Sequence, residues 1–135
     1  MTDRRLLDTN LIIRHLVQDD VKHARIAGRL FEACDREEIS LVVFEAVLAE
    51  CVFVLESFYR FGRDEIAVTL TSLIGSPGIE IANGGRYLDA LKRYRVTNLH
   101  FVDCVLAAAA AGEDVPVATF DRGFRKFADV RVWID

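Results

Sequence analysis

The sequence contains few of the residues that mark secreted or membrane-spanning proteins. It has only three cysteines and two prolines, and no long apolar segment. The longest stretch without a charge, Ile66 to Ile79, has 14 residues and includes Thr, Ser, Gly and Pro, whereas a membrane-spanning helix needs about 20 mostly apolar residues. The polar start at Met1 has no signal-peptide pattern. We therefore expect a soluble, cytoplasmic protein without a transmembrane helix.

Ligand patterns for zinc, nucleotides or a catalytic serine are also missing. The three cysteines are Cys34, Cys51 and Cys104. Their odd number and the absence of CxxC spacing favour reduced, buried thiols over a disulfide framework or a zinc site. His15, His23 and His100 lack the spacing of a metal-binding pair, and we expect His15 and His23 on the surface. No glycine-rich phosphate loop follows a strand, and no serine occupies a strand-to-helix turn.

An excess of positive charge is absent too. The 135 residues include 17 Lys and Arg against 21 Asp and Glu, which gives a net charge of −4. This balance argues against a protein that holds nucleic acid by bulk positive charge. Only three of the basic residues are lysines, and the arginines that make up the rest are suited to two-point contacts with phosphate.

What is present predicts one α/β domain. Residues 1–135, of which 52% are hydrophobic and 28% charged, fall in the range of about 100–150 residues that is typical of a single globular domain. Helical and extended patterns alternate, and no hairpin signal joins neighbouring strands. This order predicts a parallel sheet with helices on both faces, in which ligands bind at the carboxyl ends of the strands.

The expected elements follow from apolar periodicity and turn residues. The expected strands are Arg4–Asp8, Ile39–Val43, Ile79–Ala82, Val115–Thr119 and Val130–Ile134. The expected helices are Thr9–Val17, a helix capped by Asp19 or Asp20 and ending near Arg36, Glu45–Phe58, Arg63–Ile74, a helix ending near Tyr94, Phe101–Ala111 and Gly123–Phe127.

Four carboxylates stand out from their apolar surroundings. Glu50 is the sole charge between residues 46 and 55, in a segment so apolar that we expect a buried helix and a carboxylate whose desolvation must be compensated. Asp103 falls in the first turn of its helix, where the helix dipole favours a negative charge. Asp8 and Asp121 follow strands, and each has an alternative role as a helix cap.

Together these four carboxylates predict a cation site. Four converging carboxylates would repel one another unless a divalent cation neutralises them, and ligands that are all oxygen select Mg²⁺ or Mn²⁺ over zinc. Thr9, Asn10 and Thr119 supply neutral oxygens beside the acids.

The segments that contain these acids resemble the motifs of PIN-domain ribonucleases. Those segments are residues 6–13, 47–50, 101–108 and 118–124, and their order and spacing resemble the VapC toxins of toxin–antitoxin pairs. The resemblance implies a three-layer α/β/α sandwich with a central parallel sheet, and a metal-dependent endoribonuclease that hydrolyses RNA phosphodiesters. It also implies an acidic quartet that holds Mg²⁺ or Mn²⁺, Asp8, Glu50, Asp103 and Asp121, with Thr119 and Asn10 as polar helpers.

The resemblance further implies partners: an RNA substrate, an antitoxin protein and a second copy in a homodimer. Arg14, Arg122 and Arg125 lie near the acids in sequence and are candidates for holding RNA. Phe44, Glu45 and His100 depart from the pattern of the family and leave the substrate preference and the partner contacts open. The four acids of the quartet account for the whole excess of 21 acids over 17 bases, and a bound divalent cation would offset much of it. We therefore expect weak RNA binding in the absence of metal.

Two other functions stay open from the residues. One is a catalytically silent PIN-like module that only binds RNA or protein. The other is a phosphotransfer enzyme with Asp8 as nucleophile, although that class has a second Asp where this chain has Asn10. Four aromatic residues are expected in the core, or alternatively on a dimer or antitoxin surface: Phe53, Phe58, Tyr59 and Phe61.

Overall fold

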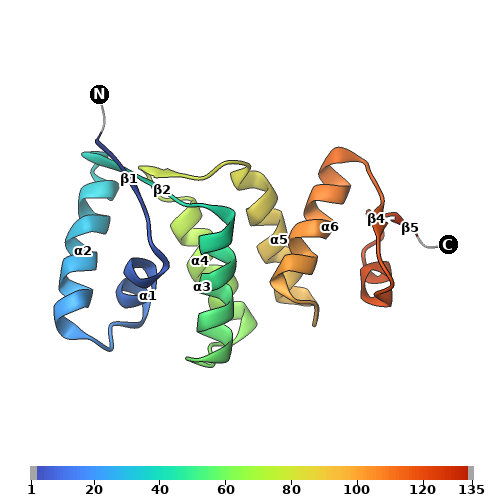
Figure 1. Cartoon of the computed structure of the whole chain (residues 1–135), viewed down its shortest axis with the longest axis horizontal. Coiled ribbons are helices and arrows are strands. Elements are labelled where there is room, and N and C mark those ends of the chain that lie inside the picture. The colour runs from blue at the N-terminus through green and yellow to red at the C-terminus, as the bar shows by residue number, and fades with distance from the viewer. Residues whose placement is uncertain (1–2, 134–135) are drawn as a thin grey trace. The chain divides into compact units, whose positions relative to one another are not determined.

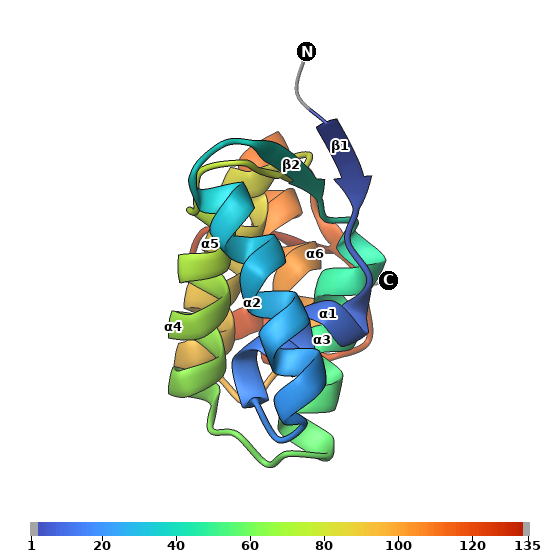
Figure 2. The same ribbon diagram turned by 90° about the vertical axis from the view of Figure 1, so that its left-hand side faces the viewer.

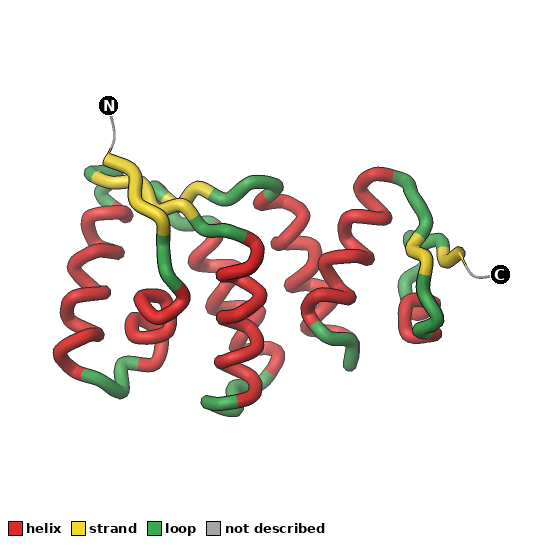
Figure 3. Tube along the Cα trace, viewed as in Figure 1, coloured by secondary structure: helices red, strands yellow, loops and turns green. Residues whose placement is uncertain are grey.

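The structure, a computed structural model, describes residues 3–133. The chain divides into two compact units, Met1–Ala82 and Asn83–Asp135, here called unit 1 and unit 2. Pairs of helices separate the short strands of unit 1, whereas unit 2 begins with two helices that precede its two strands (Figures 1 and 3). No helix within residues 3–133 is long and apolar enough to cross a membrane.

Unit 1 contains a parallel sheet of three strands. The strands are β1 (Asp3–Leu6), β2 (Ile39–Val42) and β3 (Ile79–Glu80), and they pair in the order β1-β2-β3. In the register, Leu41 of β2 lies opposite Arg5 of β1 and Ile79 of β3. Every connection between paired strands contains helices, as parallel pairing requires.

Four helices of unit 1 pack into one core with this sheet. They are α1 (Thr9–Val17), α2 (Val21–Asp35), α3 (Glu45–Ser57) and α4 (Arg63–Ile74). The helix α1 packs against α2 and α3, and α3 packs against α4. Asp20, one of the two expected caps, begins α2, because its carboxylate accepts the His23 backbone N–H at 3.1 Å. The fully buried side chains include Ile12, Leu41, Leu48, Leu55, Ile66 and Leu70.

A glycine is required where α2 approaches the sheet. Gly78, directly before β3, has φ +81°, which favours glycine. A Cβ there would lie 2.5 Å from the backbone oxygen of Cys34, near the end of α2. The close contact between this turn and α2 therefore depends on the missing side chain.

The expectation that α3 is buried all round was wrong. It buries one face, through Leu48, Cys51, Val52 and Leu55, while Glu50 and Phe53 lie on the exposed face. Apolar residues occur on both faces of this helix, so its composition alone could not tell which side faces the core.

Unit 2 consists of two packed helices and a small parallel pair of strands. Its elements are α5 (Gly84–Val96), α6 (Phe101–Glu113), β4 (Val117–Ala118), the 3₁₀ helix η1 (Arg122–Lys126) and β5 (Val132–Trp133). The helices α5 and α6 pack against each other, and β4 pairs parallel with β5. A core cluster joins α6 to the chain that follows it: Ala107, Ala110, Val117, Phe124 and Val130.

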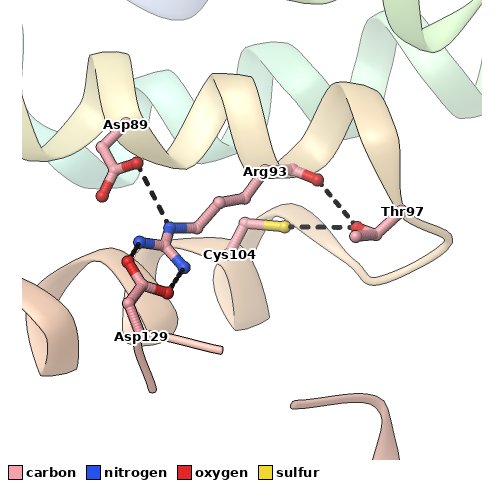
Figure 4. Close-up of polar contacts among 5 residues, drawn as sticks. All are labelled: Asp89, Arg93, Thr97, Cys104 and Asp129. Atoms are coloured by element: carbon pink, nitrogen blue, oxygen red, sulfur yellow. Dashed lines mark hydrogen bonds and ion pairs between the residues drawn. The ribbon is translucent and has the colours of Figure 1, made fainter. Parts of the chain in front are cut away.

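A buried arginine ties α5 to the segment after η1 (Figure 4). Arg93, which is 8% exposed, donates to both carboxylate oxygens of Asp129, at 2.9 and 2.5 Å, and to Asp89 at 3.2 Å. Its guanidinium carbon lies 4.9 Å from the centre of the Phe127 ring. The hydrogen bonds to Asp129 raise the pKa of Arg93 against the opposing effect of burial, so the ion pair stays charged.

The expected α/β class with parallel strand pairing is confirmed, and each expected strand and helix is present with ends shifted by a few residues. Ile134, the end of the last expected strand, lies outside the described residues. The three cysteines are free and buried, as expected. Two aromatic residues expected in the core are instead exposed, Phe53 at 68% and Phe58 at 76%.

Candidate active site

Asp8 follows β1 and takes the N-cap position of α1 without capping the helix. Its backbone is extended, with φ −86° and ψ 149°, and its side chain makes no cap hydrogen bond. The capping alternative for Asp8 is therefore wrong, and its exposed carboxylate is available to other ligands. The next residue, Thr9, is buried at 5% exposure, whereas Asn10 is exposed in the first turn of α1.

Glu50 lies in unit 1 together with Asp8, and both carboxylates act on the same thiol. Burial raises the pKa of Cys51 to about 12, and the negative charges of Glu50 and Asp8 contribute to this rise. Both charges therefore act on Cys51, in the unit where α1 and α3 pack against each other. The expected desolvation of Glu50 was wrong, because this side chain is exposed and forms no ion pair within residues 3–133.

Asp103 lies in unit 2, in the first turn of α6, as expected. The helix begins after His100, whose side chain makes no cap hydrogen bond. Asp103 is half-buried, and no hydrogen bond or ion pair engages its carboxylate in the described chain. The dipole of α6 favours a negative charge at this position, and the carboxylate has no protein partner among the described residues that would compete with a cation.

Asp121 caps η1, which confirms the role left open for it. Its Oδ1 accepts the Gly123 backbone N–H at 2.7 Å, and its own backbone N–H donates to Thr119 Oγ1 at 2.9 Å. Thr119 therefore fixes the backbone of Asp121, and Gly123 fixes one of its carboxylate oxygens. The other oxygen, Oδ2, has no partner among the described residues.

A small hollow of about 70 Å³ adjoins Asp121. Its lining residues all belong to unit 2: Thr119, Phe120, Asp121, Arg122, Arg125 and Val132. Both arginines are exposed, and neither pairs with a carboxylate in the described chain. The hollow thus combines a carboxylate, a hydroxyl and two guanidinium groups, the mixture of groups that binds a phosphate and a cation together.

Phe120 is a candidate functional residue that sequence reasoning did not single out. It is 90% exposed and lies between Thr119 and Asp121. Alternation from the buried Val117 places Phe120 on the outward side of the chain, and this signal could have found it. An exposed aromatic ring beside two arginines is suited to stacking on a nucleobase.

Arg14, by contrast, is engaged within unit 1. Its guanidinium lies 3.2 Å from Asp19 Oδ1, and Asp19 Oδ2 accepts the Tyr59 hydroxyl at 3.2 Å. These contacts tie the end of α1 to the chain after α3. The three arginines expected near the site therefore differ, because only Arg122 and Arg125 line the hollow beside a candidate acid.

Comparison with known proteins identifies the family. The family model described as "PIN domain" matches residues 5–130, nearly the whole chain. The chain belongs to the PIN-domain family. A VapC ribonuclease of Aquifex aeolicus (strain VF5) is 26% identical to this PIN-domain chain over 123 residues, which are 90% of each chain. The expected PIN-like α/β/α fold class with a central parallel sheet is thereby confirmed.

The candidate ligands of the PIN-domain chain fit a hard divalent cation. Each unit contains two of the four carboxylates, Asp8 and Glu50 in unit 1 and Asp103 and Asp121 in unit 2. No group of three potential ligands that could hold a metal ion is found within residues 3–133. The donor chemistry nevertheless suits Mg²⁺ or Mn²⁺, because all four donors are carboxylates and three of them have no protein partner in that range.

Proposed function

We propose that this PIN-domain chain is a metal-dependent endoribonuclease that acts as the toxin of a toxin–antitoxin pair. The observation that carries the proposal is the similarity to a VapC ribonuclease over 90% of both chains. The family match across residues 5–130 supports the view that units 1 and 2 belong to a single PIN domain, residues 1–135. As a toxin of this kind, the protein acts in the cytoplasm.

We infer that the acidic quartet holds Mg²⁺ or Mn²⁺. Asp8 and Asp103 act as direct ligands, and neither carboxylate has a competing protein partner among the described residues. Glu50 and Asp121 complete the site directly or through water. When bound, the cation supplies an activated water and neutralises the non-bridging oxygens of the phosphodiester.

Other side chains position the acids and the substrate. Thr119 holds the backbone of Asp121 through its hydroxyl, and Gly123 holds Asp121 Oδ1. Arg122 and Arg125 bind phosphate oxygens, since no carboxylate competes for them in the described chain. Phe120 stacks on a base of the RNA, and Asn10 contributes a neutral oxygen near Asp8.

Protein partners follow from the same assignment. We infer a cognate antitoxin and a homodimer, and unit 1 offers an apolar surface that supports such contacts. This surface contains Phe53 and Phe58, which are 68% and 76% exposed. Large exposed aromatic side chains of this kind are enriched at protein interfaces.

The test is RNA cleavage by the purified protein with and without metal. We expect cleavage in Mg²⁺ or Mn²⁺, loss of cleavage with EDTA, and recovery when Mg²⁺ is restored. Induction of the chain in cells should arrest growth, and co-expression of its antitoxin should relieve the arrest. Undiminished cleavage in EDTA would contradict the metal assignment, and the absence of cleavage with every metal would contradict the enzyme assignment.

A further inference from the structure

The surface of unit 1 contains a row of cations that no carboxylate neutralises. Lys22, Arg25 and Arg29 are exposed along α2, and none forms an ion pair in the described part of the chain. Other arginines of unit 1 are paired: Arg4 with Glu80, Arg5 with Asp3, Arg14 with Asp19 and Arg36 with Glu38. The cation row, Lys22–Arg25–Arg29, is therefore set apart from most of the basic surface of unit 1.

The spacing of the cation row places all three charges on one side of α2. Residues separated by three and four positions are neighbours on a helix surface, and the seven steps from Lys22 to Arg29 span about 10 Å. Figure 2 shows α2 at the front of unit 1. The nearest acid along this side, Glu32, lies one turn beyond Arg29, and no ion pair joins these two residues.

Apart from the N-cap carboxylate of Asp20, the charges within α2 are placed against the helix dipole. Helices are stabilised by acids in the first turn and bases in the last turn. In α2 the first turn has no acid and contains Lys22 and His23, and the last turn has no base and contains Glu32 and Asp35. The cation row therefore does not serve the helix itself, which points to an external ligand of negative charge.

A hollow of about 290 Å³ lies at the start of the cation row. It is lined by Gln18, Val21, Ala24 and Arg25, and Val21 is 72% exposed. This lining combines an amide, an apolar wall and a guanidinium group, a combination that suits a base or ribose attached to a phosphate held by Arg25.

The start of the cation row lies away from Asp8, the N-cap residue of α1. The helix α1 has nine residues, so about 13 Å of helix separates Asp8 at its beginning from Gln18 at its end. A phosphate held beside Gln18, at Arg25, is therefore not the phosphate cleaved beside Asp8. The row would contact nucleotides further along the same strand.

We propose that the cation row is a second RNA-backbone contact, which binds a stretch of substrate some nucleotides away from the cleaved bond. This inference rests on the proposed ribonuclease function. Three cations on a straight line of about 10 Å match consecutive phosphates of an extended strand. An acidic protein segment is the competing ligand, but helix-in-groove binding needs a continuous apolar groove. The exposed apolar side chains here, Val21 and Ile26, are instead interrupted by Lys22 and Arg25.

The experiment measures binding of fluorescent poly(U) in Mg²⁺ at several salt concentrations, in an Asp8→Asn background that does not cut RNA. The row variant contains Lys22→Gln, Arg25→Gln and Arg29→Gln. The matched control contains Arg36→Gln, Arg60→Gln and Lys92→Gln, which remove the same charge elsewhere. We expect the row variant to bind about tenfold or more weakly, with a salt slope shallower by about 2, since each phosphate contact on a single strand contributes about 0.7. The control should stay within about twofold.

Several results would overturn the proposal. An equal loss in the control would show that only net charge matters. Unchanged poly(U) binding in the row variant would exclude the contact, and a loss of antitoxin binding in its place would assign the row to the protein partner. An Arg25→Lys, Arg29→Lys variant keeps the charge and should bind normally, so weak binding by this variant would also count against a backbone contact.

The same measurements separate this inference from the proposed function. Binding is measured without cleavage. A wild-type chain that cleaves no RNA would therefore refute the ribonuclease function, and the poly(U) comparison would still show whether the cation row binds RNA. Conversely, the wild-type chain could cleave RNA while the row variant binds poly(U) normally. This result would support the ribonuclease function and refute RNA binding by the cation row.

Discussion

Asp121 Oδ1 accepts the backbone N–H of Gly123 at 2.7 Å. A Cβ at residue 123 would lie 3.0 Å from this oxygen and 2.5 Å from Leu99 Cδ2. Glycine is therefore the residue that lets η1 begin so close to the carboxylate. The position of one of the four candidate ligands depends on the absence of a side chain two residues later.

Gly123→Ala should lower RNA cleavage by about tenfold or more, because the new methyl group displaces the Asp121 carboxylate or the Leu99 side chain. The measurement is kcat for RNA cleavage alongside thermal unfolding. Gly112→Ala, at a position in α6 with no atom within 4 Å of the added Cβ, is the matched control and should gain about 0.5–1 kcal/mol of stability at full activity. Full activity in Gly123→Ala would contradict this role.

Phe120→Ala should weaken RNA binding by about 5- to 150-fold, the range that corresponds to about 1–3 kcal/mol for one stacked base. Phe120→Tyr keeps the ring and should bind almost normally. Val96→Ala truncates another apolar side chain of unit 2, one that is 77% exposed, and should leave RNA affinity unchanged. If truncation at Phe120 and at Val96 had the same small effect, stacking at Phe120 would be excluded.

His15 is half-buried, although the sequence predicted a surface position. Its ring stacks on Phe31 with centroids 4.4 Å apart, and its Nδ1 is buried without a hydrogen-bond partner. Burial lowers the pKa of His15 below its ordinary value of 6.5, and the negative charge of Asp35 only partly opposes this shift. The folded protein therefore binds this proton less readily than the unfolded chain does.

The free energy of unfolding should consequently fall as the pH drops below 6.5, where the unfolded chain takes up a proton on His15 before the folded protein does. Above pH 6.5 this contribution is fully present. Urea denaturation above and below pH 6.5 measures the effect. His15→Phe should flatten this pH dependence, whereas His100→Gln, at an exposed histidine, should retain it. An unchanged slope in His15→Phe would contradict the assignment.

Asp129→Asn should destabilise the protein by about 1–2 kcal/mol. An exposed ion pair contributes little to stability, whereas a buried charge without any partner costs much more. The expected loss lies between these limits because Asp89 remains near Arg93 as a second partner. Urea denaturation measures it. Asp114→Asn removes an exposed pair with Arg131 and should change stability by less than about 0.5 kcal/mol. Equal losses of stability in the two variants would show that the ion pair of the buried Arg93 contributes no more to stability than an exposed ion pair.

The order of strands and helices could be predicted because apolar alternation and turn residues are local signals. The strand before Asp8 and the helix that begins near Asp103 both follow from short segments of sequence. The capping of α2 by Asp20 was likewise one of two local alternatives.

Other features depend on packing between distant segments, which no local pattern contains. The exposure of Glu50 depends on which side of α3 meets α1 and α4. The stacking of His15 on Phe31 and the pairing of Arg14 with Asp19 depend on how α1 and α2 come together. Phe120 is an intermediate case, since strand alternation predicts its outward position but not the arginines around it.

In the proposed function, carboxylates from both units act in RNA cleavage. The most direct test compares Mg²⁺-dependent RNA cleavage by the wild-type chain, Asp8→Asn, Asp103→Asn and the exposed control Asp35→Asn, with circular dichroism to confirm folding. We expect Asp8→Asn and Asp103→Asn each to lose at least about a hundredfold in kcat, while Asp35→Asn keeps its activity. A folded Asp8→Asn or Asp103→Asn variant with wild-type activity would contradict the claim.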